Sequence, residues 1–567
     1  MKSKLIKLLV TSLTISLFLG LIGSFALASK KELTPQEWSQ TSWQDRLKYK
    51  KVIIRAGANN WGHTWMEEKQ IPTVAPFLKE SIKSGDLVTS SDWYSQALFQ
   101  LMYPEVKIEN VGVGTWKIEE IMTGFAAGNI PCNFAISIGD LGCQAAIAKK
   151  MAADLTDLVK DWEQTPYLWK NIGYIWRRAW KDGHCYGLPT EMNLWSIGYR
   201  KDWFKEAGIF NAEGKPAPPK GWTWSGFLDI AKKLTDVKKK RWGWGERLAF
   251  SQVWTPNAMS KCFGLPDATT WLIPDPTGKY TWKLPPADFS PIKKTLEFLQ
   301  NARWKDKVML AGPGGGGALG SIKGEFYAGR CAMAHTHWTD VMFADPVLRP
   351  ERWGPGTNAV DVAGVALTPR GPYGIERNET WSDIWGIPSI LDKDQIKAAF
   401  EWWNWNRFSM GYTIQLRRDL DTGIHERLPW YAVRNPYKYS YPPGYPKPEE
   451  YLPAESLEVW EAGKKVPGAP VADSYGLNTE QGYQREIFQG LIQELLGTPD
   501  ADIEKLLQKA EKEHGKKYQY KVENDKEKLA VFCADLDNYY KTYYPEWYKS
   551  EEYKKVRSYY LVWKDWK

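Results

Sequence analysis

Val106-Lys-Ile-Glu-Asn-Val111 alternates apolar and polar side chains and opens the stretch of sequence that decides the fold class. Alternation with a period of two is typical of a half-buried strand. A helix follows, because apolar residues then recur at intervals of three and four before Gly128: Ile118, Ile121, Met122 and Phe125. We expect a second strand at Phe134–Ile138 and a second helix at Leu141–Met151. The order strand, helix, strand, helix predicts an α/β fold built from right-handed βαβ units.

The same pattern continues on both sides of this stretch. Further strands are predicted at 50–56, 195–199, 330–334 and 362–367, and helices after Thr223 and along the apolar stripe at 396–403. Residues 434–453 are dense in Pro and Tyr and predict an extended connector, whereas the stretch from Asp525 onward predicts helix. The chain has 567 residues, and single cores stop growing near roughly 250–300 residues. We therefore expect at least two lobes.

The N-terminus has the pattern of a secretory signal peptide. Three lysines within the first seven residues precede an apolar run, Leu8–Leu27, which ends in Ala26-Leu27-Ala28. We expect cleavage after residue 28, and no cysteine follows that would carry a lipid anchor. Removing residues 1–28 takes the formal net charge from +8 to +5, because three lysines and no acids are lost. A net charge this small on a chain of this length does not indicate nucleic-acid binding.

Tryptophan is unusually abundant, with 32 residues, and 29 tyrosines accompany it. For any single Trp, burial in a core is the more probable role. Loops at strand ends, however, are where α/β lobes place their ligand contacts. Several tryptophans recur there: Trp61, Trp65, Trp195, Trp254, Trp338, Trp381 and Trp385. As a set they favour a surface for flat apolar faces with polar edges, which is how a sugar ring presents itself.

Motifs for catalysis or cofactor binding are mostly lacking. The glycine-rich run 312–320 has no Lys-Ser/Thr to hold a phosphate and is better interpreted as a loop, and no nucleophile elbow occurs. A carboxylate pair for glycoside hydrolysis cannot be singled out among 67 acidic residues, which leaves a glycosidase as an alternative. We expect no cofactor.

Cysteine and histidine residues suggest two further alternatives. Cys331, His335, His337 and Asp340 form the one constellation that resembles a metal site, although residues lining a cleft or a packed strand end fit as well. Without a second ligand cluster we expect no metal. The six cysteines are widely spaced, and only Cys132 and Cys143 lie close enough in sequence to suggest a disulfide.

Several segments together resemble the extracellular solute-binding proteins of ABC importers, in the family-one group that includes maltose- and oligosaccharide-binding proteins. The resemblance covers about residues 50–515 and is carried mainly by Asp182-Gly-His-Cys-Tyr-Gly-Leu-Pro189, by Gly198-Tyr-Arg-Lys-Asp-Trp-Phe-Lys-Glu-Ala-Gly-Ile209 and by Pro218-Pro-Lys-Gly-Trp-Thr-Trp224. Gly226 replaces the acidic residue usual after Thr223. The last forty or so residues have no counterpart in the family, and they either buttress the lobes or extend the cleft.

The resemblance implies the two-lobed fold of periplasmic binding proteins of type II, with the ligand in a cleft between hinged lobes. Lobe 1 would comprise residues 29–192 and 386–428, lobe 2 residues 193–385 and 429–520, and residues 521–567 a helical extension. Carried over position by position, the ligand-binding residues would be Asp140, Asn193, Trp195, Trp254, Trp338, Trp381, Asp383 and Tyr475, to which the strand-end tryptophans Trp61 and Trp65 are added.

The implied function is capture of an oligosaccharide outside the cytoplasmic membrane and its delivery to an ABC permease, with no bond chemistry. The protein would be a periplasmic or extracellular monomer. A binder of peptide or another large solute is one alternative, a secreted glycoside hydrolase a second, and a Trp-rich adhesion module without lobe closure a third.

Overall fold

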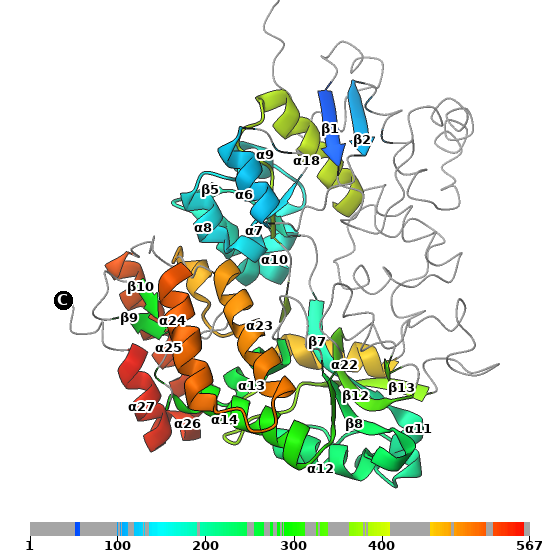
Figure 1. Ribbon diagram of the computed structural model, residues 1–567. Coiled ribbons are helices and arrows are strands. Elements are labelled where there is room, and N and C mark those ends of the chain that lie inside the picture. The colour runs from blue at the N-terminus through cyan, green and yellow to red at the C-terminus, as the bar shows by residue number, and fades with distance from the viewer. Residues whose placement is uncertain are drawn as a thin grey trace, which may run out of the picture.

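A computed structural model gives the fold of the chain. It describes residues 52–56, 99, 103, 105–110, 118–128, 130, 135–189, 193–246, 254–265, 273–275, 281–283, 286, 288–311, 325–326, 329–337, 362–377, 380–381, 384–408, 454–477, 481–517 and 525–560. Within these ranges, helices and sheets alternate as an α/β fold requires, and they gather around two large hydrophobic cores (Figure 1). No helix in the described ranges has the length and apolar character that crossing a membrane requires.

The first lobe surrounds one of these cores and contains a small antiparallel sheet. The strand order is β3 (Ile136–Ser137), β15 (Ile384–Gly386), β6 (Leu188–Pro189). Two further pairs are β1 (Val52–Ala56) with β2 (Val106–Asn110), and β4 (Trp180–Lys181) with β5 (His184–Cys185). The helices are α6 (Ile118–Ala126), α7 (Ile138–Leu141), α8 (Cys143–Ala148), α9 (Thr156–Val159), α10 (Thr165–Trp176), η2 (Arg177–Ala179) and α18 (Lys393–Phe408).

The second lobe is built on a larger mixed sheet. Its order is β11 (Met309–Ala311), β8 (Trp242–Glu246), β12 (Cys331–His337), β7 (Asn193–Arg200), β13 (Ala363–Leu367), and β14 (Thr380–Trp381) also pairs with β7. A hairpin joins β9 (Ile273–Asp275) and β10 (Thr281–Lys283). The helices before residue 310 are α11 (Lys201–Glu206), α12 (Trp224–Leu234), η3 (Val237–Lys239), α13 (Trp254–Cys262), α14 (Ser290–Gln300) and η4 (Asn301–Lys305).

The C-terminal part of the chain adds a further layer of helices to the second lobe. These are α22 (Ala454–Lys465), η5 (Ala472–Tyr475), α23 (Gln481–Gly497), α24 (Ile503–Lys517), α25 (Lys526–Tyr543), α26 (Pro545–Lys549) and α27 (Glu551–Tyr560). In Figure 1, α23 to α27, in orange and red, lie together on one side of this lobe.

Helices α25 to α27 contribute residues to the second core. Leu529, Phe532, Leu536 and Trp547 are buried in the same cluster as residues of α12, α14 and β8. Trp547 is packed so closely on Gly264, whose φ is +101°, that a Cβ at this glycine would lie 2.1 Å from the indole ring. Of the two roles considered for this extension, buttressing a lobe is therefore what the packing shows.

Local expectations from the sequence are confirmed where they depend on neighbouring residues. Helix α6 spans Ile118–Ala126, and α12 begins after Thr223, whose hydroxyl accepts a hydrogen bond from the Gly226 N–H as an N-cap does. The expectation of one helix over Leu141–Met151, preceded by a strand reaching Ile138, is wrong. The strand ends at Ser137, and Gly142, at φ +88°, separates two short helices.

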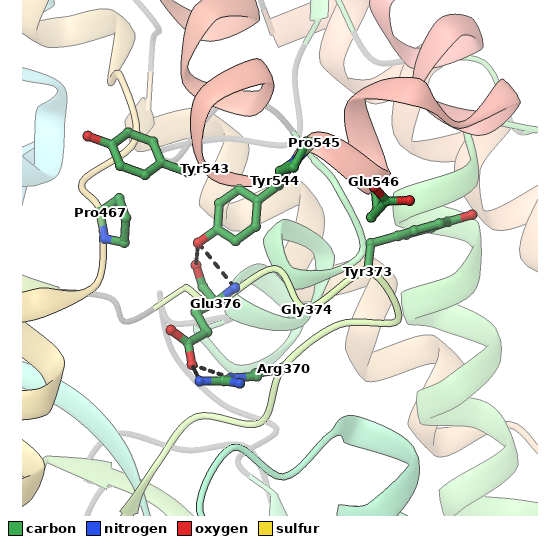
Figure 2. A pocket seen from close by; sticks show the side chains of 9 residues that line it. All are labelled: Arg370, Tyr373, Gly374, Glu376, Pro467, Tyr543, Tyr544, Pro545 and Glu546. Atoms are coloured by element: carbon green, nitrogen blue, oxygen red, sulfur yellow. Dashed lines mark hydrogen bonds and ion pairs between the residues drawn. The ribbon is translucent and has the colours of Figure 1, made fainter.

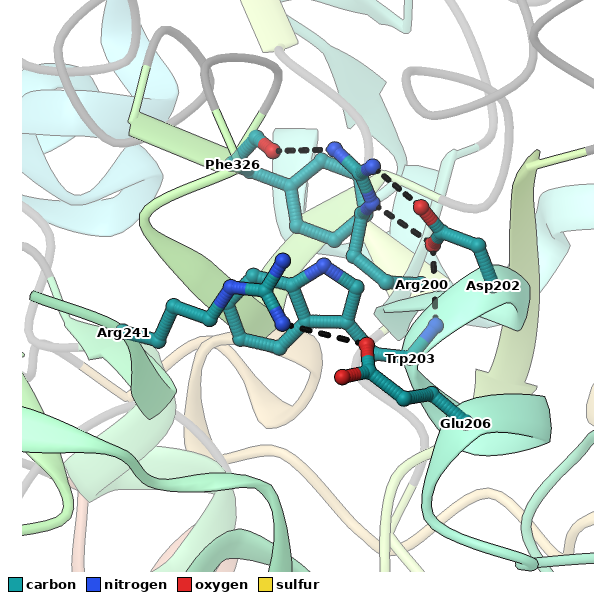
Figure 3. A network of polar contacts seen from close by, with 6 residues as sticks. All are labelled: Arg200, Asp202, Trp203, Glu206, Arg241 and Phe326. Atoms are coloured by element: carbon teal, nitrogen blue, oxygen red, sulfur yellow. Dashed lines mark hydrogen bonds and ion pairs between the residues drawn. The ribbon is translucent and has the colours of Figure 1, made fainter. Parts of the chain in front are cut away.

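The motif at 198–209, which carried much of the family resemblance, builds the start of α11. Arg200 donates from Nε to Asp202 at 2.9 Å, and Asp202 in turn accepts a hydrogen bond from the Trp203 N–H at 3.0 Å (Figure 3). An acceptor in the first turn of a helix satisfies backbone N–H groups that have no partner within the helix. These charged residues therefore fix the turn from strand β7 into helix α11.

The indole of Trp203 connects helix α11 to Arg241, the residue before strand β8. The Arg241 guanidinium lies 4.6 Å from the Trp203 ring centroid and donates to Glu206 at 3.0 Å (Figure 3). A cation over an aromatic face is attracted by the ring quadrupole. The described contacts of the motif at 198–209 therefore stabilise the fold of the second lobe.

Candidate functional site

The chain crosses between the lobes after β6 and after β14, and the strands on either side of these two crossings are paired. In the first lobe, β6 and β15 are antiparallel, with Pro189 opposite Ile384. In the second lobe, β7 and β14 are also antiparallel, with Asn193 opposite Trp381. The two crossings between the sheets, from β6 to β7 and from β14 to β15, are therefore flanked by paired strands at both ends, an arrangement that we call the paired connection. Strand β7 rises toward the first lobe in Figure 1.

Several strands of the second sheet end at the edge next to this connection. Strands β8, β11 and β12 are parallel to one another, with Ala311 opposite Glu246. The antiparallel partner β7 begins where β12 ends, so that Trp195 lies opposite His337. Carboxyl ends of parallel strands are where open α/β sheets place their ligands. This edge, next to the paired connection, is the candidate site.

Trp195 lies beneath this edge as a buried ring. Its indole packs on the imidazole of His335, with ring centroids 4.9 Å apart and an angle of 30° between the planes. Trp195 is 1% exposed and His335 is 6% exposed. In the conformation described, the Trp195 ring therefore supports the edge from within, and a direct contact of this ring with a ligand stays a prediction.

The first lobe approaches the same connection through α7. A Cβ at Gly139 would lie 3.2 Å from the backbone N of Ile384, so the α7 backbone rests against β15. This contact brings the backbone of Asp140 close to the start of β15. The first lobe thus contributes Asp140 to the region of the connection, and the second lobe contributes Asn193 and Trp381.

The other predicted residues divide into two groups. Trp61, Trp65, Trp338 and Asp383 lie outside the described residues, and the side chains of Asp140, Asn193, Trp254 and Trp381 are likewise not described. By sequence, Trp338 directly follows the end of β12 and Asp383 lies between β14 and β15. The backbone brings Asn193 and Trp381 together as a pair, and the ligand contacts of all these residues stay predictions.

Tyr475 lies at a different place, on η5. Its hydroxyl donates to Asp535 at 2.7 Å, and its ring lies edge-on to Phe532 at 5.3 Å, both on α25. Burial and the neighbouring carboxylate of Asp535 raise the pKa of this tyrosine. The C-terminal extension therefore holds the Tyr475 side chain, and no described contact joins it to the other predicted residues.

A second contact between the lobes was not predicted from the sequence. Arg178 of η2 in the first lobe donates to the buried Asp473 of η5 in the second, at 3.1 Å. On the same side, Lys528 of α25 pairs with Asp182 at 3.3 Å. An ion pair between residues 295 positions apart leaves no local pattern in a sequence.

Glu246 is the residue at the candidate site that sequence reasoning missed. It ends β8 and is 3% exposed, although it carries a carboxylate. Its position at the end of a buried strand, beside the candidate site, makes this carboxylate a candidate polar group of that site. The segment Trp242-Gly-Trp-Gly-Glu246, in which an acid closes an aromatic strand, was the signal that could have identified it.

The alternative of a metal site near Cys331 receives no further support from the described residues. Burial raises the pKa of the Cys331 thiol well above its ordinary value, which disfavours the thiolate that binds metals. Among the described side chains, no group of three His, Cys, Asp or Glu is arranged to hold a metal ion. The side chain of His337 and all of Asp340 lie outside this set.

Residues 97–407 match the family model described as bacterial extracellular solute-binding protein. No curated protein matches the chain.

Many solved structures are similar in fold. An ABC substrate-binding protein from Listeria monocytogenes in complex with cycloalternan is 18% identical with a TM-score of 0.53, covering 82% of this chain and 99% of that one. Maltose-bound MalE3 of T. maritima is 16% identical with a TM-score of 0.51, covering 82% and 98%. UgpB from Mycobacterium tuberculosis, in complex with glycerophosphocholine, is 15% identical with a TM-score of 0.52, covering 82% and 97%.

Proposed function

Because the chain belongs to the bacterial extracellular solute-binding protein family, we propose that it captures an oligosaccharide between its lobes and delivers it to the permease of an ABC importer. The observation that carries the proposal is the paired connection of β6 to β7 and β14 to β15. Two adjacent strands can change the angle between lobes with small backbone rotations, and a ligand that touches both lobes selects the closed form.

The site would use aromatic rings and polar side chains together. Asn193 and Trp381 on the connection, with Asp383, would bind from the hinge, while Asp140 from one lobe and Trp338 from the other would bind from opposite sides. Trp61, Trp65, Trp195 and Trp254 would complete the site, whereas the side chain of Tyr475 is held by Asp535 and Phe532 of α25. Stacking on indole faces and hydrogen bonds to hydroxyl edges suit a sugar of several units.

The ligand class has support from the proteins that share this fold. Cycloalternan and maltose occupy two of them, whereas UgpB holds glycerophosphocholine. The fold therefore accommodates ligands other than sugars, and the abundance of tryptophan at strand ends in this chain is what favours an oligosaccharide here. The protein would act outside the cytoplasmic membrane as a monomer and without a cofactor, after removal of residues 1–28.

Two measurements on the same samples test the proposal. Calorimetry against a panel of oligosaccharides and peptides should give saturable binding of a sugar, and solution scattering should give a smaller radius of gyration at saturation. Trp338→Ala should weaken binding by several-fold or more, because a lost stacking contact alone is worth about 0.5–1.5 kcal/mol. Phe210→Ala, at an exposed aromatic residue after α11, is the matched control and should bind as wild type does.

The alternatives give different results. Peptide binding without sugar binding would indicate a peptide carrier. A sugar that is bound without a change in scattering would indicate an adhesion module. Cleavage of the sugar that persists through repurification would indicate a glycoside hydrolase.

A further inference from the structure

A pocket of about 300 Å³ lies on the second lobe, between the loop at 370–376 and the junction of α25 with α26. We call it the tail pocket, because residues of the C-terminal extension form one of its walls. Figure 2 shows Tyr543 and Pro467 on one side, Tyr373 on the other, Tyr544 between them, and Arg370 with Glu376 below. No predicted ligand-binding residue lines this pocket, so it is separate from the candidate site.

The walls of the tail pocket are fixed by contacts beneath it. The Tyr544 hydroxyl donates to the carbonyl of Glu376 at 3.0 Å and accepts from its N–H at 3.3 Å. The ring of Tyr373 packs on the buried indole of Trp547, with centroids 5.0 Å apart. A ligand would therefore meet a surface that is already formed, which lowers the entropic cost of binding.

Tyr543 is the exception, because its ring is only partly covered. It lies next to Tyr539, with ring centroids 5.3 Å apart, and it is 53% exposed. Large aromatic side chains carry much of the binding energy at recognition sites when a ligand covers them. An exposed ring beside Pro467 offers the apolar face on which a flat ligand would stack.

The charges of the pocket select against ionic ligands. Arg370 and Glu376 form an ion pair through two guanidinium nitrogens and one carboxylate oxygen, so each compensates the other. Glu546 at the rim likewise lies 3.5 Å from Lys549, so the charged groups that line the pocket are paired and favour neither a cation nor an anion. Both side chains of the pair are partly exposed, at 43% and 25%, which leaves polar atoms within reach of a ligand.

We propose that the tail pocket is a second saccharide site, which takes one or two rings of a neutral sugar. Adjacent hydroxyls of a sugar can donate to the carboxylate of Glu376 and accept from the guanidinium of Arg370, while the ring face stacks on Tyr543. A volume of about 300 Å³ is at the lower end of small-molecule pockets, which suits a ligand of that size. This site goes beyond the proposed function, because it works independently of lobe closure.

A pair of variants on one helix tests the inference. Tyr543→Ala removes the stacking face, and Val531→Ala is the matched control, because both residues are 53% exposed and lie on α25. Maltose, cellobiose and diacetylchitobiose serve as probes in calorimetric titrations of the full chain. With at least one probe, we expect a second, weaker binding event that Tyr543→Ala weakens about three- to tenfold, that Val531→Ala leaves unchanged, and that Tyr543→Phe retains.

Further variants separate this inference from the proposed function. Trp381→Ala should affect the tighter event and leave the weaker one intact. Arg370→Gln should weaken only the weaker event, since it removes the guanidinium and leaves the charge of Glu376 uncompensated. If no probe gives an event that depends on Tyr543, the inference is overturned, whatever happens between the lobes. If only the Tyr543-dependent event occurs, the inference stands and the proposed function fails.

Discussion

Helix α18 in the first lobe and helices α25 to α27 in the second both bury a row of aromatic rings, and they do so by different means. In α18, the indoles of Trp402, Trp403 and Trp405 are at most 3% exposed and pack on other rings. Trp402, for example, lies 4.7 Å from the ring centroid of Phe99 in an edge-on arrangement. The described contacts of these three indoles are ring contacts that fill space, although Glu401 on the same helix accepts a buried hydrogen bond from the Tyr103 hydroxyl at 3.1 Å.

In the C-terminal helices several of the buried rings are tyrosines, and hydroxyls of Tyr539 and Tyr540 take part in a polar network. Arg377 is 5% exposed and donates to Tyr539 at 2.6 Å and to Tyr540 at 2.8 Å. Its guanidinium also lies 4.8 Å from the Tyr539 ring centroid. The Tyr540 hydroxyl in turn donates a hydrogen bond to the carbonyl of Leu265 at 3.2 Å. The comparison teaches that buried aromatic rings can be stabilised mainly by packing in one region and by directed hydrogen bonds of their hydroxyls in another.

The largest expected effect tests the apolar side of this comparison. Trp402→Ala removes a fully buried indole, and such changes cost about 3–5 kcal/mol of unfolding free energy. Urea unfolding followed by circular dichroism measures the loss. Ile390→Ala, at a residue 44% exposed just before α18, is the control and should stay within about 0.5 kcal/mol of wild type. A cost for Trp402→Ala no larger than the control would mean that α18 is not part of a cooperative core.

A smaller effect is expected when one hydroxyl is removed from the network. Tyr540→Phe keeps the ring but leaves the Leu265 carbonyl without this donor and Arg377 with one acceptor fewer. Leaving buried polar groups unsatisfied costs about 1–3 kcal/mol. The matched control is Tyr543→Phe on the same helix, because that residue is 53% exposed. Equal stability of the two variants would show that volume alone holds this region as well.

The network should also respond to alkaline pH, whereas indoles do not titrate. Burial raises the pKa of Tyr540 to about 12, although the guanidinium of Arg377 opposes the shift. Between the ordinary value of 10.0 and about 12, the unfolded chain releases this proton and the folded chain keeps it. The free energy of unfolding therefore falls as the pH rises through this window, by up to about 1.4 kcal/mol per pH unit from this group.

Tyr540→Phe is the variant that checks the assignment of this pH dependence. Its unfolding free energy, measured in urea at several pH values, should fall less steeply than that of wild type above pH about 10. A slope identical to that of wild type would mean that other groups account for the alkaline loss.

How much of this could be predicted from the sequence depends on the distance between the residues involved. The stripe at 396–403 predicts α18, and Thr223 predicts the start of α12, because in both cases the interacting residues lie within one or two turns. The network at Arg377 was not predictable, because its partner Tyr539 lies 162 residues away. The break at Gly142 was missed for a local reason, since apolar spacing alone does not show a glycine at positive φ.

The candidate site shows the same division. The family resemblance predicted that Asn193 and Trp381 belong to one site. The pairing of β7 with β14 places their backbones opposite each other, and their contacts with a ligand stay predictions. Glu246 was overlooked because a carboxylate on a strand usually faces solvent, and its burial depends on β11 and β12 on either side.

The smallest effect is expected at the surface ion pairs that also attach the C-terminal extension. Lys555 of α27 pairs with Asp288 at 2.6 Å, but both side chains are more than half exposed. Exposed pairs of this kind gain little, because water screens the attraction and two flexible side chains must be ordered. Lys555→Ala should therefore leave the urea midpoint unchanged within error, and added salt should not alter that result. Trp547→Phe, at a fully buried ring close to the same junction, should lower the midpoint clearly. A loss at Lys555 as large as that at Trp547 would mean that surface charge, rather than the buried rings and their hydrogen bonds, holds the extension on the second lobe.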